Sequence, residues 1–257
     1  MPRMCLVALA WNVHPRWRLV VAGNRDELHA RPTAALARWA DAPVLAGRDL
    51  CSGGTWMGLG PDGRVAVVTN VRNGLAPPFA GPSRGELPLR FLAGRDPAPA
   101  YAAALAGEAG RYAPFNLLVA DADACAYVGH HPDVAREHRL ARGTYGLSNG
   151  AFDAPWPKTT RLRGVLAAWA DAGETDPEPL WAALADEQIA DDNLLPDTGV
   201  GLALERRLSA AFIREQDYGT RASTLVLVGH DGSTRIHERR FGPGGVFEGE
   251  TMLESAP

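Results

Sequence analysis

Hydrophobic residues along this chain gather in short runs bounded by turn residues, a pattern typical of buried strands. The runs predict strands near residues 5–11, 18–23, 55–60, 64–71, 115–121, 125–129, 144–149, 222–229 and 233–241. Pro61, Asp62 and Gly63 separate the third run from the fourth and predict a hairpin there. The second run stops at Gly23, where the polar residues 24–27 follow at once. We expect that strand to end at Gly23.

Other stretches carry apolar residues at helical spacing. Leu162, Val165, Leu166 and Trp169 recur at i, i+3, i+4 and i+7, which predicts a helix over residues 158–173. Further helices are predicted near residues 86–94, 97–110 and 204–212. The strands come in hairpins and the helices in blocks between them, an order that favours antiparallel sheets covered by helices. With no internal repeat and no linker, we expect residues 1–257 to form a single domain.

Composition and charge exclude several classes of protein. The net charge of -4 and the absence of a Lys/Arg block argue against nucleic-acid binding. No stretch approaches the roughly 18 apolar residues of a membrane span, and the N-terminus lacks the features of a signal peptide. The cysteines Cys5, Cys51 and Cys125 have no CxxC spacing, which argues against a zinc site or a disulfide framework. We therefore expect a cytoplasmic protein in which Cys51 and Cys125 are structural thiols.

The basic residues are almost all arginine, because Lys158 is the only lysine in the chain. Together with the abundant alanine and glycine, this bias indicates a GC-rich, bacterial genome, and we assign the arginine excess no function. The sequence has no GxGxxG, P-loop or GxSxG motif, so dinucleotide, nucleotide and serine-hydrolase functions lack their sequence signatures.

Cys5 follows Met4, and an initiator methionine before a small residue is normally removed. If translation begins at Met4, Cys5 carries both a thiol and a free α-amine, whose reference pKa of about 8 suits it to accept the thiol proton. A nucleophile that uses its own N-terminal amine as base is a known solution to covalent catalysis. The alternative is that Cys5 is a small buried hydrophobe on a strand, as free cysteines usually are.

Polar residues follow the second predicted strand at the point where a hairpin would bring them back to Cys5. Antiparallel pairing of residues 5–11 with residues 18–23 places Asn24, Arg25 and Asp26 beside Cys5. A carboxylate there can hold an ammonium group or orient the thiol, and an arginine can favour the thiolate. The alternative is an ion pair that only caps the end of the strand.

The chain resembles the NRDE family, also called the transport and Golgi organisation protein 2 family, through a series of sequence blocks in family order. The blocks are "NRDE" at residues 24–27, "GGTWMGLG", "TNVR", "SRGELPL", "FNLLVAD", "GLSNGAFDAPWPK", "LPDTGV" and "YGTRASTLVLV" followed by "ERRF". They extend from Cys5 to about Phe241, nearly the whole chain. The family in turn resembles the N-terminal-nucleophile hydrolases that include bile-salt hydrolase and penicillin V acylase.

This resemblance implies an α+β fold, a four-layer αββα sandwich with two antiparallel sheets between helical layers. It also implies an amidase-like site. The residues that match the site are Cys5 as nucleophile, Arg25, Asp26, Asn70 and Asn149, and Arg221 as an arginine that supports the nucleophile. A one-residue shift of the "NRD" match would put Asn24 in the place of Arg25.

Two of the matched residues also suit the chemistry on physical grounds. A tetrahedral oxyanion needs fixed donors, and the side-chain amides of Asn70 and Asn149 supply them without adding a titrating group. Both residues end a predicted strand, so turn formation is the alternative role, above all for Asn149 before Gly150.

Two functions follow from the resemblance. The first is a cysteine hydrolase acting on an amide or thioester of an apolar acyl group, with no cofactor. The second is a non-catalytic carrier that binds haem or an acyl-CoA in the same pocket. The doublet His130 and His131 could supply a haem ligand, but a polar loop is the simpler interpretation. Both functions need a small apolar or acyl ligand. Trp56, Trp156 and Trp181 could line its pocket, although large aromatics usually belong to the core.

One feature departs from the amidase pattern. The residues "MPR" precede Met4, so Cys5 is internal as written and its nitrogen is an amide, which cannot act as a base. Either the true start is Met4, which we expect, or this chain has lost the nucleophile chemistry of the amidases.

Overall fold

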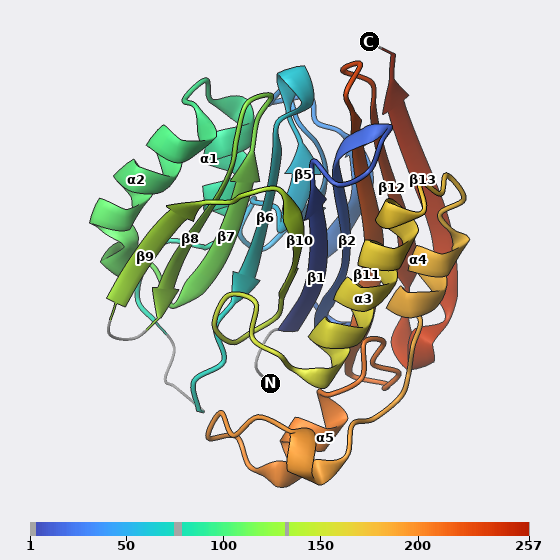
Figure 1. Ribbon diagram of the computed structural model, residues 1–257. Helices are drawn as coiled ribbons and strands as arrows, with labels where there is room; N and C mark the ends of the chain where they lie inside the picture. The colour runs from blue at the N-terminus through green and yellow to red at the C-terminus, as the bar shows by residue number, and fades with distance from the viewer. Residues whose placement is uncertain (1–3, 75–78, 132–133, 257) are drawn as a thin grey trace.

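The computed structural model describes residues 4–74, 79–131 and 134–256, which form two antiparallel sheets stacked face to face (Figure 1). The residues 1–3 that precede Met4 lie outside this part. The first sheet has the strand order β10-β1-β2-β11-β12-β13. Its strands are β1 (Met4–Trp11), β2 (Trp17–Leu28), β10 (Gly143–Leu147), β11 (Tyr218–Gly229), β12 (Thr234–Phe241) and β13 (Phe247–Ser255).

The second sheet keeps sequence order, β3-β4-β5-β6-β7-β8-β9. Its strands are β3 (Thr33–Arg38), β4 (Leu45–Asp49), β5 (Met57–Leu59), β6 (Val65–Asn70), β7 (Phe115–Ala120), β8 (Cys125–His131) and β9 (Val134–Arg139). Because each strand is joined to the next by a short connection or a helical excursion on one face, the sheet forms a meander.

Helices cover the outer face of each sheet (Figure 1). The helices α1 (Glu86–Ala93) and α2 (Ala98–Glu108) pack on the second sheet, whereas α3 (Pro157–Asp171) and α4 (Glu178–Leu184) pack on the first. The short helix α5 (Leu202–Arg207) lies beyond the N-terminal end of β1. Single 3₁₀ turns occur at Pro61–Gly63, Ala109–Arg111, Asp192–Leu194 and Pro243–Gly245. No helix in the described ranges is long and apolar enough to cross a membrane.

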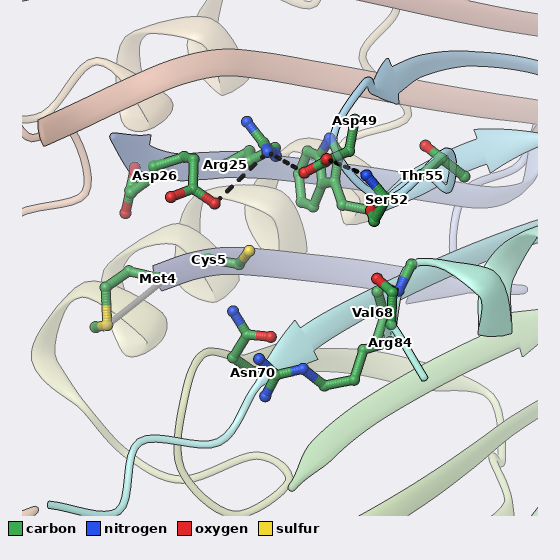
Figure 2. Close-up of a pocket in the computed structure, with 14 residues that line it drawn as sticks. Met4, Cys5, Arg25, Asp26, Asp49, Ser52, Thr55, Val68, Asn70 and Arg84 are labelled. Carbon is green, nitrogen blue, oxygen red and sulfur yellow. Dashed lines mark hydrogen bonds and ion pairs between the residues drawn. The ribbon is translucent and has the colours of Figure 1, made fainter. Parts of the chain in front are cut away.

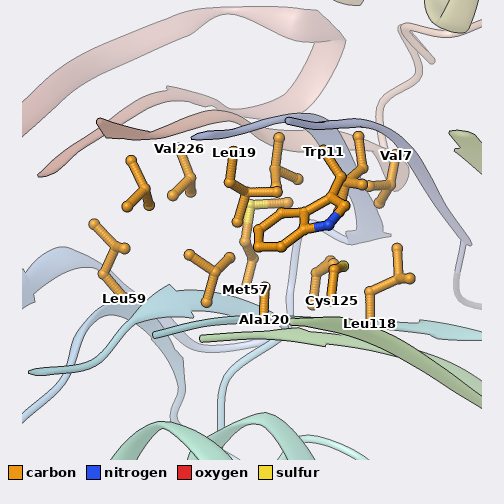
Figure 3. Packing of buried hydrophobic residues seen from close by; sticks show 14 of the residues in the cluster. Val7, Trp11, Leu19, Met57, Leu59, Leu118, Ala120, Cys125 and Val226 are labelled. Atoms are coloured by element: carbon orange, nitrogen blue, oxygen red, sulfur yellow. The ribbon is translucent and has the colours of Figure 1, made fainter. Parts of the chain in front are cut away.

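Three buried hydrophobic clusters separate the four layers, and the central strands contribute to two of them. In β1, Val7, Leu9 and Trp11 enter the cluster between the sheets (Figure 3). Leu6, Ala8 and Ala10 point to the opposite side and pack under α3 and α4. A strand covered on both faces needs apolar residues at every position. This requirement explains why the first runs of the sequence are continuously hydrophobic rather than alternating.

The predicted αββα sandwich is confirmed, and so is the hairpin of β5 and β6. Two element boundaries were wrong. The helix predicted near residues 204–212 ends at Arg207. Strand β2 does not end at Gly23 but continues through the polar residues to Leu28. It continues because β1 flanks it as far as Asp26 and β11 flanks it as far as Leu28, so that the backbone donors and acceptors of the polar residues find partners.

Candidate functional site around Cys5

Cys5 lies near the start of β1, directly opposite Arg25 in the antiparallel ladder with β2. In the same register Met4 is opposite Asp26 and Leu6 is opposite Asn24. The hairpin predicted from the sequence is therefore present, and it brings the polar residues to the nucleophile candidate (Figure 2). Because side chains alternate along a strand, Cys5 and Met4 point to opposite faces of the first sheet.

The four polar residues 24–27 are all buried, so they do not form a solvated end of a strand. Asn24 donates from Nδ2 to the carbonyl oxygens of Leu184 and Ala211, at 2.7 and 2.8 Å, and accepts from Ser223 Oγ at 2.6 Å. These bonds bind β2 to the helical layer. Among the described residues, Arg25 lines the cleft at Cys5 and Asn24 does not. The geometry thus favours Arg25 over Asn24 for the matched position.

A cleft of about 60 Å³ opens over Cys5 between the two sheets. Besides the residues of β1 and β2, it is lined by Asn70 at the end of β6, by Trp56 and Thr55 before β5, and by Arg84 before α1 (Figure 2). Asn70 therefore shares the cleft with Cys5, as the sequence match predicted. Trp56 is only partly buried and contributes an apolar wall.

Carboxylates fix the position of Arg25 in this cleft. Its Nη2 lies 3.2 Å from Asp49 Oδ2 and 3.7 Å from Glu27 Oε2. Asp49 also binds Arg31, with Nε 2.6 Å from the same oxygen. The second terminal nitrogen of Arg25, Nη1, is buried and has no hydrogen-bond partner. The guanidinium group is therefore held by carboxylates through Nη2.

Asn149 and Ser148, which directly follow β10, make hydrogen bonds with the backbone of Cys5. The Cys5 nitrogen donates to Asn149 Oδ1 at 3.2 Å, and Ser148 Oγ donates to the Cys5 carbonyl oxygen at 2.8 Å. Asn149 Nδ2 in turn donates to the carbonyl oxygen of Asn70 at 2.7 Å. Asn149 is fully buried. Its oxygen thus faces the nitrogen of the nucleophile, which points to a positioning role rather than the oxyanion contact expected for it.

A buried charged cluster lies on the other face of β1. Asp26 accepts a hydrogen bond from Thr220 Oγ1 at 2.7 Å through Oδ1, and its Oδ2 has no hydrogen-bond partner within the described residues. Burial raises the pKa of Asp26 to about 6, against the opposing effects of Lys158, Thr220 and Arg25. Burial also lowers the pKa of Lys158 to about 8, although Asp26 acts in the opposite sense. The ammonium of Lys158 donates to the carbonyl oxygen of Leu208 at 2.8 Å.

A buried ion pair completes the cluster. Arg72 Nη2 lies 2.8 Å from Glu205 Oε2, and both side chains are almost completely buried. Sequence reasoning missed Lys158, Arg72 and Glu205 as members of the site. One signal was available, because Lys158 is the only lysine of an arginine-rich chain and lies within one of the family blocks.

The side chain of Met4 fills the space between these polar groups. Met4 is completely buried, and its Sδ lies 3.9 Å from Arg72 Nη1. It packs in a small cluster with Tyr218, whose hydroxyl, like Asp26 Oδ2, has no side-chain hydrogen-bond partner. A thioether cannot satisfy such groups, and each buried polar atom left unpaired costs about 1–3 kcal/mol. With Met4 in place, Asp26 Oδ2 and the hydroxyl of Tyr218 therefore lack a side-chain partner within the described residues.

The Cys5 thiol is unreactive in this setting. Burial, and then the charge of Asp26, raise the pKa of Cys5 to about 12, while Arg25 acts in the opposite sense. A thiolate is the reactive form of cysteine. With Met4 attached, Cys5 has no base and stays protonated at neutral pH.

Arg221 does not line the cleft at Cys5. It is the extra residue at a bulge in β11, between Thr220 and Ala222. Its Nη1 donates to the carbonyl oxygens of Leu28 and Arg31, and Arg221 lines a second cavity next to the first. Its predicted support of the nucleophile therefore cannot come from direct contact across the Cys5 cleft.

The remaining candidates lie apart from Cys5. His130 and His131 form the end of β8 rather than a loop, and His131 Nε2 lies 3.0 Å from Asn116 Oδ1. Trp181 belongs to the core beneath α4. No group of His, Cys, Asp and Glu side chains in the described ranges is arranged to hold a metal ion.

Comparison with known proteins identifies relatives along nearly the whole chain. The family described as Transport and Golgi organisation 2 matches residues 4–243. A Transport and Golgi organization protein 2 homolog from Bos taurus is 33% identical, and the alignment covers 92% of each chain. The homolog from Homo sapiens is 31% identical with the same coverage. These relatives come from animals, so the bacterial source remains a prediction.

Solved structures share the fold at low sequence identity. A variant of conjugated bile acid hydrolase from Clostridium perfringens superimposes with a TM-score of 0.55 at 9% identity, covering 97% of this chain and 92% of that one. The Caenorhabditis elegans ortholog of N-acylethanolamine-hydrolyzing acid amidase gives a TM-score of 0.50 at 11% identity, covering 87% and 92%. This similarity confirms the N-terminal-nucleophile type of fold.

Proposed function

Because the chain belongs to the Transport and Golgi organisation 2 family and has the fold of these amidohydrolases, we propose that it is a cysteine hydrolase of the N-terminal-nucleophile type. Its substrate would be an amide or thioester of an apolar acyl group. The observation that carries this proposal is the environment of the Cys5 nitrogen. That nitrogen lies against Asn149 Oδ1, and Met4 on its other side pairs with Asp26, whose Oδ2 lacks a partner.

Removal of residues up to Met4 would turn the Cys5 nitrogen into an α-amine at this place. An α-ammonium has three donors, and Asn149 Oδ1 and Asp26 Oδ2 are acceptors suited to hold it. Its positive charge would lower the pKa of the adjacent thiol, and its neutral form would accept the thiol proton. The same removal would relieve the mismatch between the thioether and the polar groups around it.

In the proposed reaction, the α-amine takes the proton of Cys5 while the sulfur attacks the carbonyl carbon. The carbonyl electron pair moves to oxygen, and the side-chain amide of Asn70 donates a hydrogen bond to the oxyanion. When the tetrahedral intermediate collapses, the leaving amine or thiol takes the proton from the α-ammonium. Water, deprotonated by the same α-amine, then cleaves the acyl-cysteine and releases the acid.

Paired measurements of binding and turnover test this function with a panel of acyl amides and acyl thioesters. Cys5→Ala should abolish turnover and retain binding. Asn70→Ala should lower turnover on the order of a hundredfold with little change in binding, because an oxyanion donor acts mainly in the transition state. Asn73→Ala, an exposed residue three positions further along the chain, is the matched control and should behave as wild type.

The carrier alternative, with haem or an acyl-CoA as ligand, makes the opposite prediction for the same proteins. A carrier has no transition state, so the loss of one neutral hydrogen bond at Asn70 would change affinity by only about 1 kcal/mol. The hydrolase proposal fails if wild type turns over none of the panel while a haem absorbance band or tight acyl-CoA binding is found.

A further inference from the structure

A second cavity, of about 210 Å³, adjoins the cleft at Cys5 and shares the residues Arg25, Asp49 and Trp56 with it. It lies between the two sheets at the edge strand β3 of the second sheet, with β3 and β4 on one side and the interior strands β11 and β12 of the first sheet on the other. The cavity is larger than the Cys5 cleft and has small apolar residues, among them Ala34 and Ala222, beside charged ones. We call it the edge cavity.

Arginines outnumber acids around the edge cavity. Arg25, Arg48, Arg221 and Arg240 line it, against Asp49, Glu238 and Glu248. The acids are only partly available as partners for these arginines. Asp49 is held by Arg31 through two hydrogen bonds, of 2.6 and 3.0 Å. Glu238 is buried and accepts from the backbone N–H of Leu36 at 2.8 Å, and burial raises its pKa.

Two of these arginines have buried donors without partners. Arg25 Nη1 and Arg221 Nε are inaccessible to solvent and make no hydrogen bond. The side chain of Arg25 is 10% exposed, so its charge is largely desolvated. Burial, followed by the charge of Arg25, lowers the pKa of Arg221, so the two guanidinium groups repel each other. Arg25 is buried and Arg221 is partly buried, so an anion bound to both guanidinium groups would offset part of their repulsion.

We propose that the edge cavity binds an oxyanion, a carboxylate or phosphate group, through Arg25 and Arg221. Guanidinium groups bind planar carboxylates and phosphates with charge-assisted hydrogen bonds, and Arg25 and Arg221 both line this cavity. If the proposed hydrolase function holds, this anion is part of the substrate. A substrate with its acyl carbonyl at Cys5 would then carry an acidic group that reaches past Arg25 into the edge cavity.

Titration of small anions tests the cavity without any turnover. Calorimetry is done on the Cys5→Ala protein with inorganic phosphate and with acetate, in separate experiments at a constant ionic strength set with chloride. We expect saturable 1:1 binding. Tighter binding of phosphate would indicate a phosphate site, and tighter binding of acetate would indicate a carboxylate site. Arg221→Gln should weaken the binding of that anion roughly tenfold to a hundredfold, the value of a hydrogen bond to a charged group.

Two further variants keep the test decisive. Arg221→Gln removes the side chain that binds the Leu28 and Arg31 carbonyls and could unfold the bulge. Arg221→Lys keeps a charged donor for those carbonyls but lacks the Nε–H, so it should fold and still bind the anion severalfold more weakly. Arg38→Gln, at an exposed residue of β3 outside the cavity, is the matched control and should bind as the parent protein does.

The proposal is overturned if neither anion binds saturably, or if the folded Arg221 variants bind like the control. Since Cys5→Ala cannot turn over, a failure of the hydrolase proposal leaves this result intact. Conversely, turnover of neutral acyl substrates without anion binding would refute the edge cavity alone.

Discussion

Asp26→Asn in the chain that retains Met4 should change how stability depends on pH. The folded protein raises the pKa of Asp26 from 3.8 to about 6, so the native state holds this proton more tightly than the unfolded chain does. The resulting stabilisation is fully present below about pH 4 and is lost as the pH rises through about 6. Asparagine has no such proton, and it can still accept the hydrogen bond from Thr220 Oγ1 that Oδ1 accepts at 2.7 Å.

The size of the effect follows from the two pKa values. One pKa unit is worth about 1.4 kcal/mol, so the shift from 3.8 to about 6 corresponds to about 3 kcal/mol. Lys158, with a pKa of about 8, stays charged in both states between pH 4 and 7 and adds no slope there. The lowered pKa of His29 gives a slope of opposite sign in both proteins. Subtracting one protein from the other therefore cancels the contribution of His29.

Urea unfolding at pH 4, 5, 6 and 7 measures this difference. The free energy of unfolding of wild type minus that of Asp26→Asn should fall by about 2.5 kcal/mol between pH 4 and 7, because the unfolded carboxyl group is already more than half ionised at pH 4. Asp171→Asn, at an exposed residue that ends α3, is the control. Its free energy of unfolding should change with pH as that of wild type does. If the free energies of unfolding of Asp26→Asn and wild type changed in parallel with pH, folding would not raise the pKa of Asp26. In a chain that begins at Cys5, the α-ammonium should keep Asp26 ionised and reduce the difference.

Two further predictions concern burial around Cys5. Glu205→Gln should destabilise the protein by about 3–5 kcal/mol in urea unfolding, because it leaves the buried charge of Arg72 without its partner. Asp192→Asn, which opens an exposed ion pair, should leave stability unchanged, and equal losses would contradict the buried cluster. With Met4 retained, iodoacetamide at pH 8 should label exposed Cys51 but not Cys5, because a pKa of about 12 leaves roughly one thiol in ten thousand as thiolate. Rapid labelling of Cys5 would show that its thiol is already activated.

Much of the fold could be predicted from local sequence patterns. Continuous apolar runs predicted the central strands, and antiparallel pairing of the first two runs placed residues 24–26 beside Cys5, as the register of β1 and β2 confirms. The end of β2 could not be predicted in this way, because residues 24–27 are polar and would ordinarily end a buried strand. They remain in the strand because distant elements, such as Leu184 and Ser223 for Asn24, supply their partners.

The candidate site was predictable where the hairpin alone determines it, and less so where distant segments meet. Arg25 and Asp26 follow directly from the pairing of β1 with β2. Lys158 and Glu205 come from segments far along the chain, and no local pattern placed them near Cys5. Arg221 is next to Thr220, whose hydroxyl contacts Asp26, but the bulge in β11 carries Arg221 into the edge cavity instead.

The intact mass of the protein, expressed from its own gene and purified without a tag, shows directly whether Cys5 becomes the N-terminal residue. We expect a single mass that corresponds to residues 5–257, with Cys5 as the first residue. A mass that includes Met4 at full occupancy would contradict it, because the Cys5 nitrogen would remain an amide and could not serve as the base.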